Sequence, residues 1–164
     1  MNAADVLKYG HQTVLQTLEG VPMAEWETAG VCGVWSVKEI VVHLASFEQL
    51  LAEVLTTQLD GGPTPTLDEL LAVGGERFND LQVPRRRGKP ADEALAEYND
   101  WHARVMPLLA RIPAERLRQP GTIPWYGDEY SLEDLLVYQY YGHKREHCAQ
   151  VDVFRDRLAG AGAG

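Results

Sequence analysis

Apolar residues recur every three or four positions along most of this sequence, which is the spacing of one face of an α-helix. Long segments with this period cover residues 3–18, 37–59, 90–112 and 132–158. We find no internal repeat and no segment in which apolar and polar residues alternate as in a half-buried β-strand. The pattern predicts an all-α protein, a four-helix bundle whose connections are longer than those of a minimal bundle.

Capping signals mark the start of two of these helices. Ser36 and Glu39 have the spacing of a capping box, in which each side chain bonds the backbone N–H of the other residue. Trp35 precedes the cap and is placed to pack on Ile40 as a hydrophobic staple. The run Ser131-Leu-Glu-Asp134 repeats the capping box at the start of the last helix. Turn formers separate the helices at Gly20-Val-Pro22, at Gly61-Gly-Pro63 and through residues 119–130.

The region between the second and third long segments is less regular. A short helix is expected after Thr64-Pro-Thr66, and another over residues 76–83 that ends at Pro84. Pro107 lies inside the third long segment and should bend it or remove one backbone hydrogen bond.

The composition fits one soluble globular domain. A chain of 164 residues with 45% hydrophobic and 24% charged residues can bury its own core without disulfides. We assign residues 1–159 to this domain and the glycine-alanine segment 160–164 to a flexible tail. The formal net charge of -9 disfavours nucleic-acid binding, because that affinity comes largely from Lys and Arg. The basic cluster Arg85-Arg86-Arg87-Gly-Lys89 is short, and we expect it to be a solvated loop or helix end.

The chain starts without an apolar signal segment and has no uninterrupted apolar run near the length of about 18 residues that spans a membrane. These features predict a cytoplasmic protein with no membrane partner. Cys32 and Cys148 are then expected to be reduced and to serve in packing. Cys148 adjoins His147 but points about 100° away from it on a helix.

Two histidines lie four residues apart in the C-terminal segment. Because positions four apart share a helix face and positions seven apart nearly do, His143, His147 and Gln150 should project together. Two imidazoles can supply two corners of a metal site, which needs at least one more ligand from elsewhere.

His43 is the candidate for the third ligand. It lies beside the apolar stripe of the second long segment, where alone it fits a core histidine hydrogen-bonded to a neighbour. Together with His143 and His147 it makes three histidines from two helices, which leaves open positions on a bound ion, as in catalytic sites. We therefore predict a divalent metal on these three residues. The expected hydrogen-bond partners of the ligands are Glu39, Glu146 and Gln150.

Other interpretations of the histidines remain open. The run His143-Lys-Arg-Glu-His147 also matches the H-x-x-E-H pattern of inverzincin peptidases. Such an enzyme needs an acidic ligand far downstream, and here only Asp152 and Asp156 follow, on the same helix. His102 is a reserve ligand candidate, and His11 is expected to lie at the surface or in packing.

The run Trp35-Ser36-Val37-Lys38-Glu39 followed by His43, together with the His143-x-x-x-His147-x-x-Gln150 ending, resembles the DinB-like four-helix bundle superfamily. This superfamily includes bacillithiol- and mycothiol-dependent enzymes. The resemblance covers nearly the whole chain and implies an up-down-down-up bundle. It also implies a divalent metal, often nickel or zinc, held by the three matching histidines.

One position departs from the fuller pattern of the superfamily, in which another histidine immediately precedes the last one. Glu146 occupies that place here. The asparagine-containing middle segment and the Tyr-x-His-x-x-x-His ending, which begins at Tyr141, also resemble the colibactin self-resistance branch (ClbS/DfsB). Members of that branch need not use a metal.

The resemblance implies two functions. Characterised relatives transfer a low-molecular-weight thiol to electrophiles or isomerise maleylpyruvate, which suggests a metal-dependent thiol S-transferase or a hydrolase acting in detoxification. Its cofactors would be zinc or nickel and a low-molecular-weight thiol, and its substrate a small molecule. The alternative is a non-catalytic, stress-related or ligand-binding bundle without metal. A homodimer is a further expectation, because bundles of this kind often dimerise.

Overall fold

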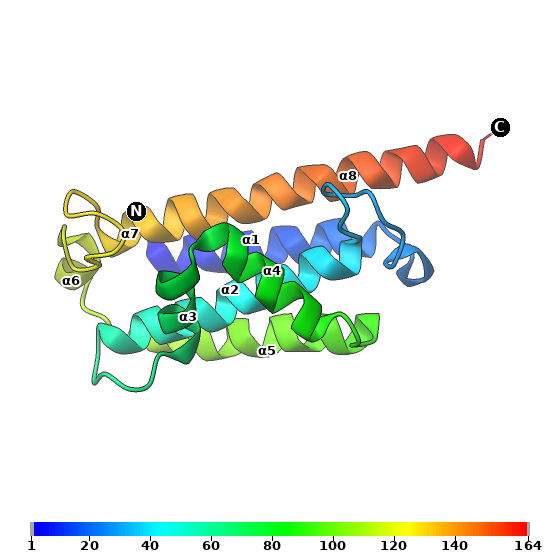
Figure 1. The fold of residues 1–164 in the computed structure, drawn as a ribbon. Helices are drawn as coiled ribbons and strands as arrows, with labels where there is room; N and C mark the ends of the chain where they lie inside the picture. Colours follow the sequence, from blue (N-terminus) through cyan, green and yellow to red (C-terminus); the bar gives the residue numbers. More distant parts are fainter. Residues whose placement is uncertain (1, 164) are drawn as a thin grey trace.

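The computed structural model describes residues 2–163, and this part of the chain is built from helices (Figure 1). Within that range the only β-type pairing is an isolated bridge between Cys32 and Trp35 in a loop. The prediction of an all-α fold is confirmed. In chain order the helices are α1 (Ala3–Glu19), the short 3-10 helix η1 (Met23–Glu25), α2 (Val37–Thr57), α3 (Pro65–Val73), α4 (Gly75–Arg86), α5 (Ala91–Ala110), α6 (Ala114–Arg118), α7 (Leu132–Leu135), the π-helix η2 (Leu136–Gly142) and α8 (His143–Ala161).

Helix α2 lies inside the fold and is buried on nearly all sides. It packs against α5 and α8, while α3 and α4 cover a further side, and α1 packs against α5 and α8 (Figure 1). Six consecutive residues, 41–46, are buried on α2. A helix that buries side chains all round belongs in the interior of a protein rather than at its surface.

Both predicted capping boxes are present. The hydroxyl of Ser36 accepts from the backbone N–H of Glu39 at 3.2 Å, and the Glu39 carboxylate accepts from the Ser36 N–H at 3.0 Å. The hydroxyl of Ser131 accepts from the Asp134 N–H at 3.3 Å, and the Asp134 carboxylate accepts from the Ser131 N–H at 2.8 Å. These bonds satisfy N–H groups that have no partner inside the first helical turn.

The last long helix is continuous from Leu132 to Ala161, as predicted, but it is not α-helical throughout. One α-turn, α7, leads into the π-helix η2, and α8 begins at His143. Hydrogen bonds in a π-helix reach the fifth residue along the chain, so residues five apart share a face. Leu135 and Tyr140, five apart, are both buried. Since an apolar period of three to four residues also fits this segment, the sequence pattern did not distinguish the two helix types.

Close packing of α1 against η2 depends on a glycine. Gly10 is buried, and a Cβ atom there would lie 3.2 Å from the ring of Tyr141. Side chains at this position would therefore push the two helices apart.

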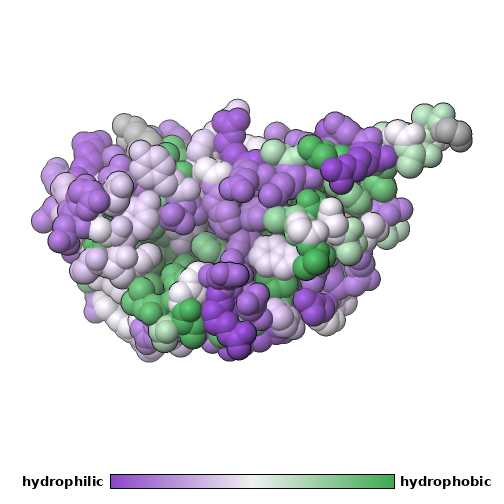
Figure 2. Space-filling view, turned by 45° about the horizontal axis from the view of Figure 1, so that its top comes forward, coloured by the Kyte–Doolittle hydropathy of each residue, from purple (hydrophilic) through white to green (hydrophobic). Residues whose placement is uncertain are grey.

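Helix α8 extends past the domain boundary expected at residue 159. It remains helical through Gly160 and Ala161 and is capped at Gly162. The first residues of the segment expected as a tail, 160–164, therefore belong to the helix. Residue 164 lies outside the described range. The C-terminal turns of α8 project beyond the rest of the bundle (Figure 1, Figure 2).

Helix α2 is also the one helix in residues 2–163 that is long and apolar enough to cross a membrane, with a mean hydropathy of 1.3 over 18 residues. The sequence prediction missed this window because it considered only uninterrupted apolar runs. In the bundle 72% of the window is buried. Core helices of soluble proteins pass the same test, and the face of the molecule in Figure 2 is mainly hydrophilic, with small separate hydrophobic areas.

Candidate metal centre

The side chains of His43, His143 and His147 meet between α2 and α8. The Nε2 atom of His143 lies 2.9 Å from Nε2 of His43 and 2.9 Å from Nε2 of His147. One ring nitrogen from each histidine lies within 4.8 Å of the other two. Two nitrogens that each lie about 2.1 Å from one ion are about 3 Å apart at bond angles near 90–110°. Nε2 of His143 is therefore spaced from each of the other two Nε2 atoms as two ligands of one ion would be.

The opposite ring nitrogen, Nδ1, faces an oxygen acceptor in His147. Nδ1 of His147 lies 2.8 Å from the Gln150 Oε1 atom. This acceptor favours the proton on Nδ1 of His147, because a carbonyl oxygen cannot donate a hydrogen bond. The backbone carbonyl of Gln139, one turn before His143, lies near the ring of His143 and favours its charged form.

This choice of tautomer has a consequence for Nε2. With the proton on Nδ1, the Nε2 atom of His147 carries a lone pair that faces Nε2 of His143 across 2.9 Å. Either a proton on Nε2 of His143 or a cation between the two rings would satisfy this lone pair. The donor set of three imidazoles therefore fits a cation.

Burial keeps the three rings uncharged at neutral pH. It lowers the pKa of His143 to about 4, with further contributions from His147 and Lys144. Burial also lowers the pKa of His43 well below its usual value, and that of His147 to a smaller extent because Gln150 stabilises the charged ring. Neutral imidazole is the form that binds metal ions.

Aromatic side chains enclose the histidines. The ring centroid of Trp35 lies 4.9 Å from that of His43, and the ring of Phe47 lies 4.8 Å from His43 and 4.9 Å from His143. His43 and His147 are buried, whereas His143 is half-buried and provides the exposed side of the group. Apolar walls of this kind limit access of water and strengthen electrostatic interactions inside a site.

One known protein family matches the chain. A family model described as the DinB superfamily matches residues 7–151, which include all three histidines and Gln150. The chain belongs to the DinB superfamily. Searches among curated proteins and among solved structures gave no match. The resemblance noted in the sequence is thus confirmed at the level of the superfamily.

The three expected partners of the histidines lie in different surroundings in this DinB-superfamily protein. Gln150 contacts His147 directly. Glu39 instead completes the capping box and forms an ion pair with Arg87 at 2.9 Å. Glu146 is exposed and forms no hydrogen bond with His147. Burial lowers the pKa of His147, and the charge of Glu146 opposes part of that shift.

The loop before α2 brings a thiol, that of Cys32, near Gln150. Burial raises the pKa of the Cys32 thiol, while Gln150 acts in the opposite direction. Cys148, which follows His147 in sequence, is buried in the apolar core, as the packing interpretation expected.

Helix α4 supplies a neighbour that the sequence did not indicate. Asn79 lies beside the ring of His43 and favours its charged form, although neither His43 Nδ1 nor Asn79 Oδ1 has a hydrogen bond of good geometry. The irregular apolar pattern of residues 76–83 gave no sign that this segment covers a ligand. Helix α4 also continues through Pro84 to Arg86, two residues beyond the predicted end.

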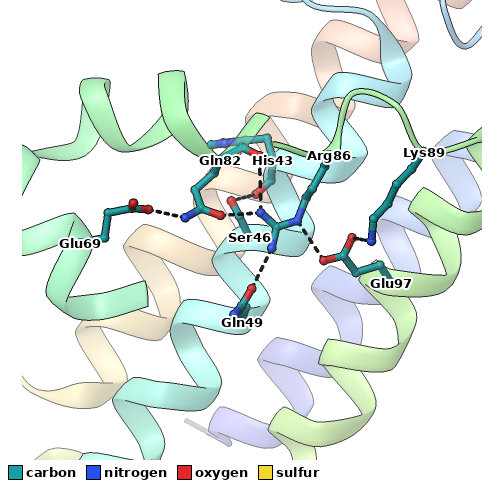
Figure 3. A network of polar contacts seen from close by, with 8 residues as sticks. All are labelled: His43, Ser46, Gln49, Glu69, Gln82, Arg86, Lys89 and Glu97. Carbon is teal, nitrogen blue, oxygen red and sulfur yellow. Dashed lines mark hydrogen bonds and ion pairs between the residues drawn. The ribbon is translucent and has the colours of Figure 1, made fainter. Parts of the chain in front are cut away.

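Arg86 ties α4 to the rest of the bundle (Figure 3). Its guanidinium donates to Glu97 on α5 at 2.9 Å and to Gln49 on α2 at 2.7 Å, and it also bonds Gln82. The expectation that the whole basic cluster is solvated was wrong for Arg86, which is buried. This ion pair holds α4, and with it Asn79, against α2.

The two remaining histidines lie outside the group. The rings of His11 and His102 stack on each other with centroids 3.8 Å apart. Neither joins the three converging nitrogens of the described residues.

Proposed function

We propose that this protein is a metal-dependent enzyme of the DinB superfamily, with one divalent ion held by His43, His143 and His147. The supporting observation is the convergence of three imidazoles, in which Nε2 of His143 lies 2.9 Å from Nε2 of His43 and 2.9 Å from Nε2 of His147. Zinc and nickel are the best candidates, because neutral imidazole is a preferred ligand for both.

The proposal includes an up-down-down-up arrangement of the long helices. In Figure 1, α1 and α8 run from left to right, while α2 and α5 run from right to left. Helices α2 and α8 thus carry their histidines on neighbouring, oppositely directed elements, which is how bundles build sites from facing side chains.

We propose a thiol S-transferase or a hydrolase that acts on a small electrophile. Bound to three imidazoles, a divalent ion has open positions and lowers the pKa of a thiol or water that occupies one of them. The chain supports this chemistry with ligands that are all neutral. Because no carboxylate among the described residues joins the three histidines, the charge of the ion is left to attract an anionic thiolate or hydroxide.

The surrounding residues would orient this site rather than react. Gln150 holds the ring of His147. Trp35 and Phe47 exclude water from the buried side. In this proposal the substrate approaches past half-buried His143, and the protein acts in the cytoplasm.

A metal-free ligand-binding bundle, as in the ClbS/DfsB branch, is the second candidate. It is favoured by the Nε2 distances of 2.9 Å, which also fit hydrogen bonds if one ring moves its proton to Nε2. Exposed Glu146 at the place of a further histidine supports the same view. In this case the three histidines would serve the stability of the core alone.

Metal content separates the two candidates. Protein purified without a metal-affinity tag and incubated with zinc or nickel should hold about one ion per chain, measured by elemental analysis after gel filtration. His147→Ala should lose the ion, whereas His11→Ala, which removes a histidine outside the group, should retain it. A wild-type chain that stays metal-free under these conditions would sink the proposal.

A further inference from the structure

A layer of polar side chains crosses the middle of the bundle. Each long helix contributes one residue, namely His11 on α1, Glu48 on α2, His102 on α5 and Lys144 on α8, and we call these four the polar layer. The layer separates two apolar clusters of the core. On each helix, a residue of one cluster lies on one side of the polar residue in sequence, and a residue of the other cluster lies on the other side. The residues of the first cluster are Leu7, Leu50, Val105 and Tyr140. Those of the second are Val14, Ala45, Tyr98 and Cys148.

Glu48 is the centre of this layer. Its carboxylate forms an ion pair with Lys144, and the side chains of the two residues are only 1% and 3% exposed. The same carboxylate lies 3.6 Å from Nδ1 of His102, whose ring stacks on His11. Through Glu48 the polar layer therefore connects α2 to α5 and to α8.

The ion pair is charged in the folded protein. Burial by itself would raise the pKa of Glu48, but attraction to Lys144, with a further contribution from nearby His102, outweighs it and lowers the pKa to about 2. A buried ion pair adds little to stability compared with apolar side chains of similar size, because desolvation cancels most of the attraction. An ion pair in the core between two apolar clusters thus needs an explanation other than stability.

The location of the pair supplies that explanation. Lys144 directly follows His143, and Glu48 lies five residues after His43, or about 7.5 Å along the helix. The pair therefore joins the two helices that carry the histidines, close to the histidines themselves. A shift of α8 by a single residue would move it about 1.5 Å along its axis and turn it by about 100°. Lys144 would then leave Glu48, and His143 and His147 would turn away from His43.

We propose that Glu48 and Lys144 are positioning residues, whose ion pair fixes the register of α8 against α2 and so holds the three histidines at the spacing of one metal ion. This inference rests on the proposed metal site. Polar pairs in apolar cores can select one packing arrangement at little gain in stability. Here the arrangement selected is the one in which both helices aim their ligands at the same point.

A pair of apolar replacements tests the proposal. Glu48→Leu and Lys144→Met each leave one charge buried without a partner, and each should lower the melting temperature. The double variant Glu48→Leu/Lys144→Met removes both charges and should regain most of that loss. If the pair positions the ligands, the double variant should nevertheless bind Co²⁺ about tenfold more weakly than wild type and show a changed visible absorption spectrum.

Controls separate positioning from stability. Lys144→Arg keeps the ion pair and should keep the wild-type Co²⁺ spectrum. Leu109→Ala, on α5 in one of the apolar clusters, should lower the melting temperature and leave Co²⁺ affinity unchanged. If the double variant does not fold, Glu48→Gln, which keeps the shape of the side chain, takes its place in the comparison.

The outcomes are distinct for the two proposals. A double variant, or Glu48→Gln, with wild-type Co²⁺ affinity and spectrum overturns the positioning role. Affinity that falls equally in Leu109→Ala overturns it as well, because the loss would then follow stability. A wild-type protein that binds no Co²⁺ overturns the metal site itself.

Discussion

The Nδ1 atom of His147 lies 2.8 Å from the side-chain oxygen of Gln150, one turn further along α8. This contact fixes the tautomer of the histidine and points its Nε2 atom at His143.

Replacing Gln150 should weaken metal binding without unfolding the protein. Gln150→Leu removes the acceptor for Nδ1 and should lower the affinity for zinc about tenfold, the lower end of the range for partners of metal-bound histidines. Gln150→Glu keeps an acceptor and should bind zinc at least as tightly as wild type. Competition with a chromophoric chelator measures both, and equal affinities for wild type and Gln150→Leu would contradict the role of this contact.

The capping box at the start of α2 should be measurable as stability. Ser36→Ala removes the acceptor for the Glu39 N–H, which should lower the free energy of unfolding by about 1 kcal/mol. Ser36→Thr keeps the hydroxyl and serves as the control. Urea unfolding followed by circular dichroism gives both values, and a Ser36→Ala protein as stable as Ser36→Thr would show that this box contributes nothing.

Two glycines in helices should respond oppositely to the same substitution. Gly160→Ala, in an open part of α8, should raise the free energy of unfolding by up to about 1 kcal/mol, because alanine has the higher helix propensity. Gly10→Ala would bring its Cβ to 3.2 Å from Tyr141 and should lower the free energy of unfolding despite the same propensity gain. Thermal melts of the two variants side by side test this, and a stabilised Gly10→Ala protein would show that α1 and η2 separate at no cost.

The metal-free protein should lose stability as the pH falls from about 6.5 to 4. Burial, followed by His102 and Lys144, lowers the pKa of His11 to about 4, while the unfolded chain binds a proton on this residue near pH 6.5. Between these values the unfolded state holds more protons, so the free energy of unfolding decreases with decreasing pH. Glu48, whose pKa is lowered from 4.5 to about 2, adds a loss of stability that begins near the lower end of that range and continues below it.

His11→Gln tests the contribution of this residue. The variant should show a shallower dependence of the free energy of unfolding on pH between about 4 and 6.5, by at most one proton. Part of the slope should remain, since the pKa of His143 is lowered to about 4 as well. Identical slopes for wild type and His11→Gln in urea unfolding would show that His11 titrates normally in the folded protein.

Several features of this fold could be predicted from sequence because each depends on local spacing. The capping residues Ser36 and Ser131 begin helices where the pattern indicated. The four-residue spacing of His143 and His147 placed both on one face, and His43 meets them from the second long segment.

Other features depend on contacts between distant segments, which spacing does not encode. Glu48 lies beside the apolar stripe of α2 like many solvated residues, and only the approach of Lys144 and His102 makes it a buried centre. The same holds for Asn79, which reaches His43 from a segment without a clear apolar face.

The π-helix η2 holds one residue that an ordinary α-helix of the same rotation would not. Removing a single residue from Leu136–Gly142 would let the segment wind as an ordinary α-helix, since a π-helix holds about one residue more per turn. Because the missing residue and the tighter winding offset each other, the side chains after the deletion would keep nearly the same direction relative to α7. If the full segment wound as an α-helix without a deletion, His143 and His147 would instead turn by about 100° away from their present direction. The wide turn thus lets the chain carry one more residue and still direct both histidines at α2.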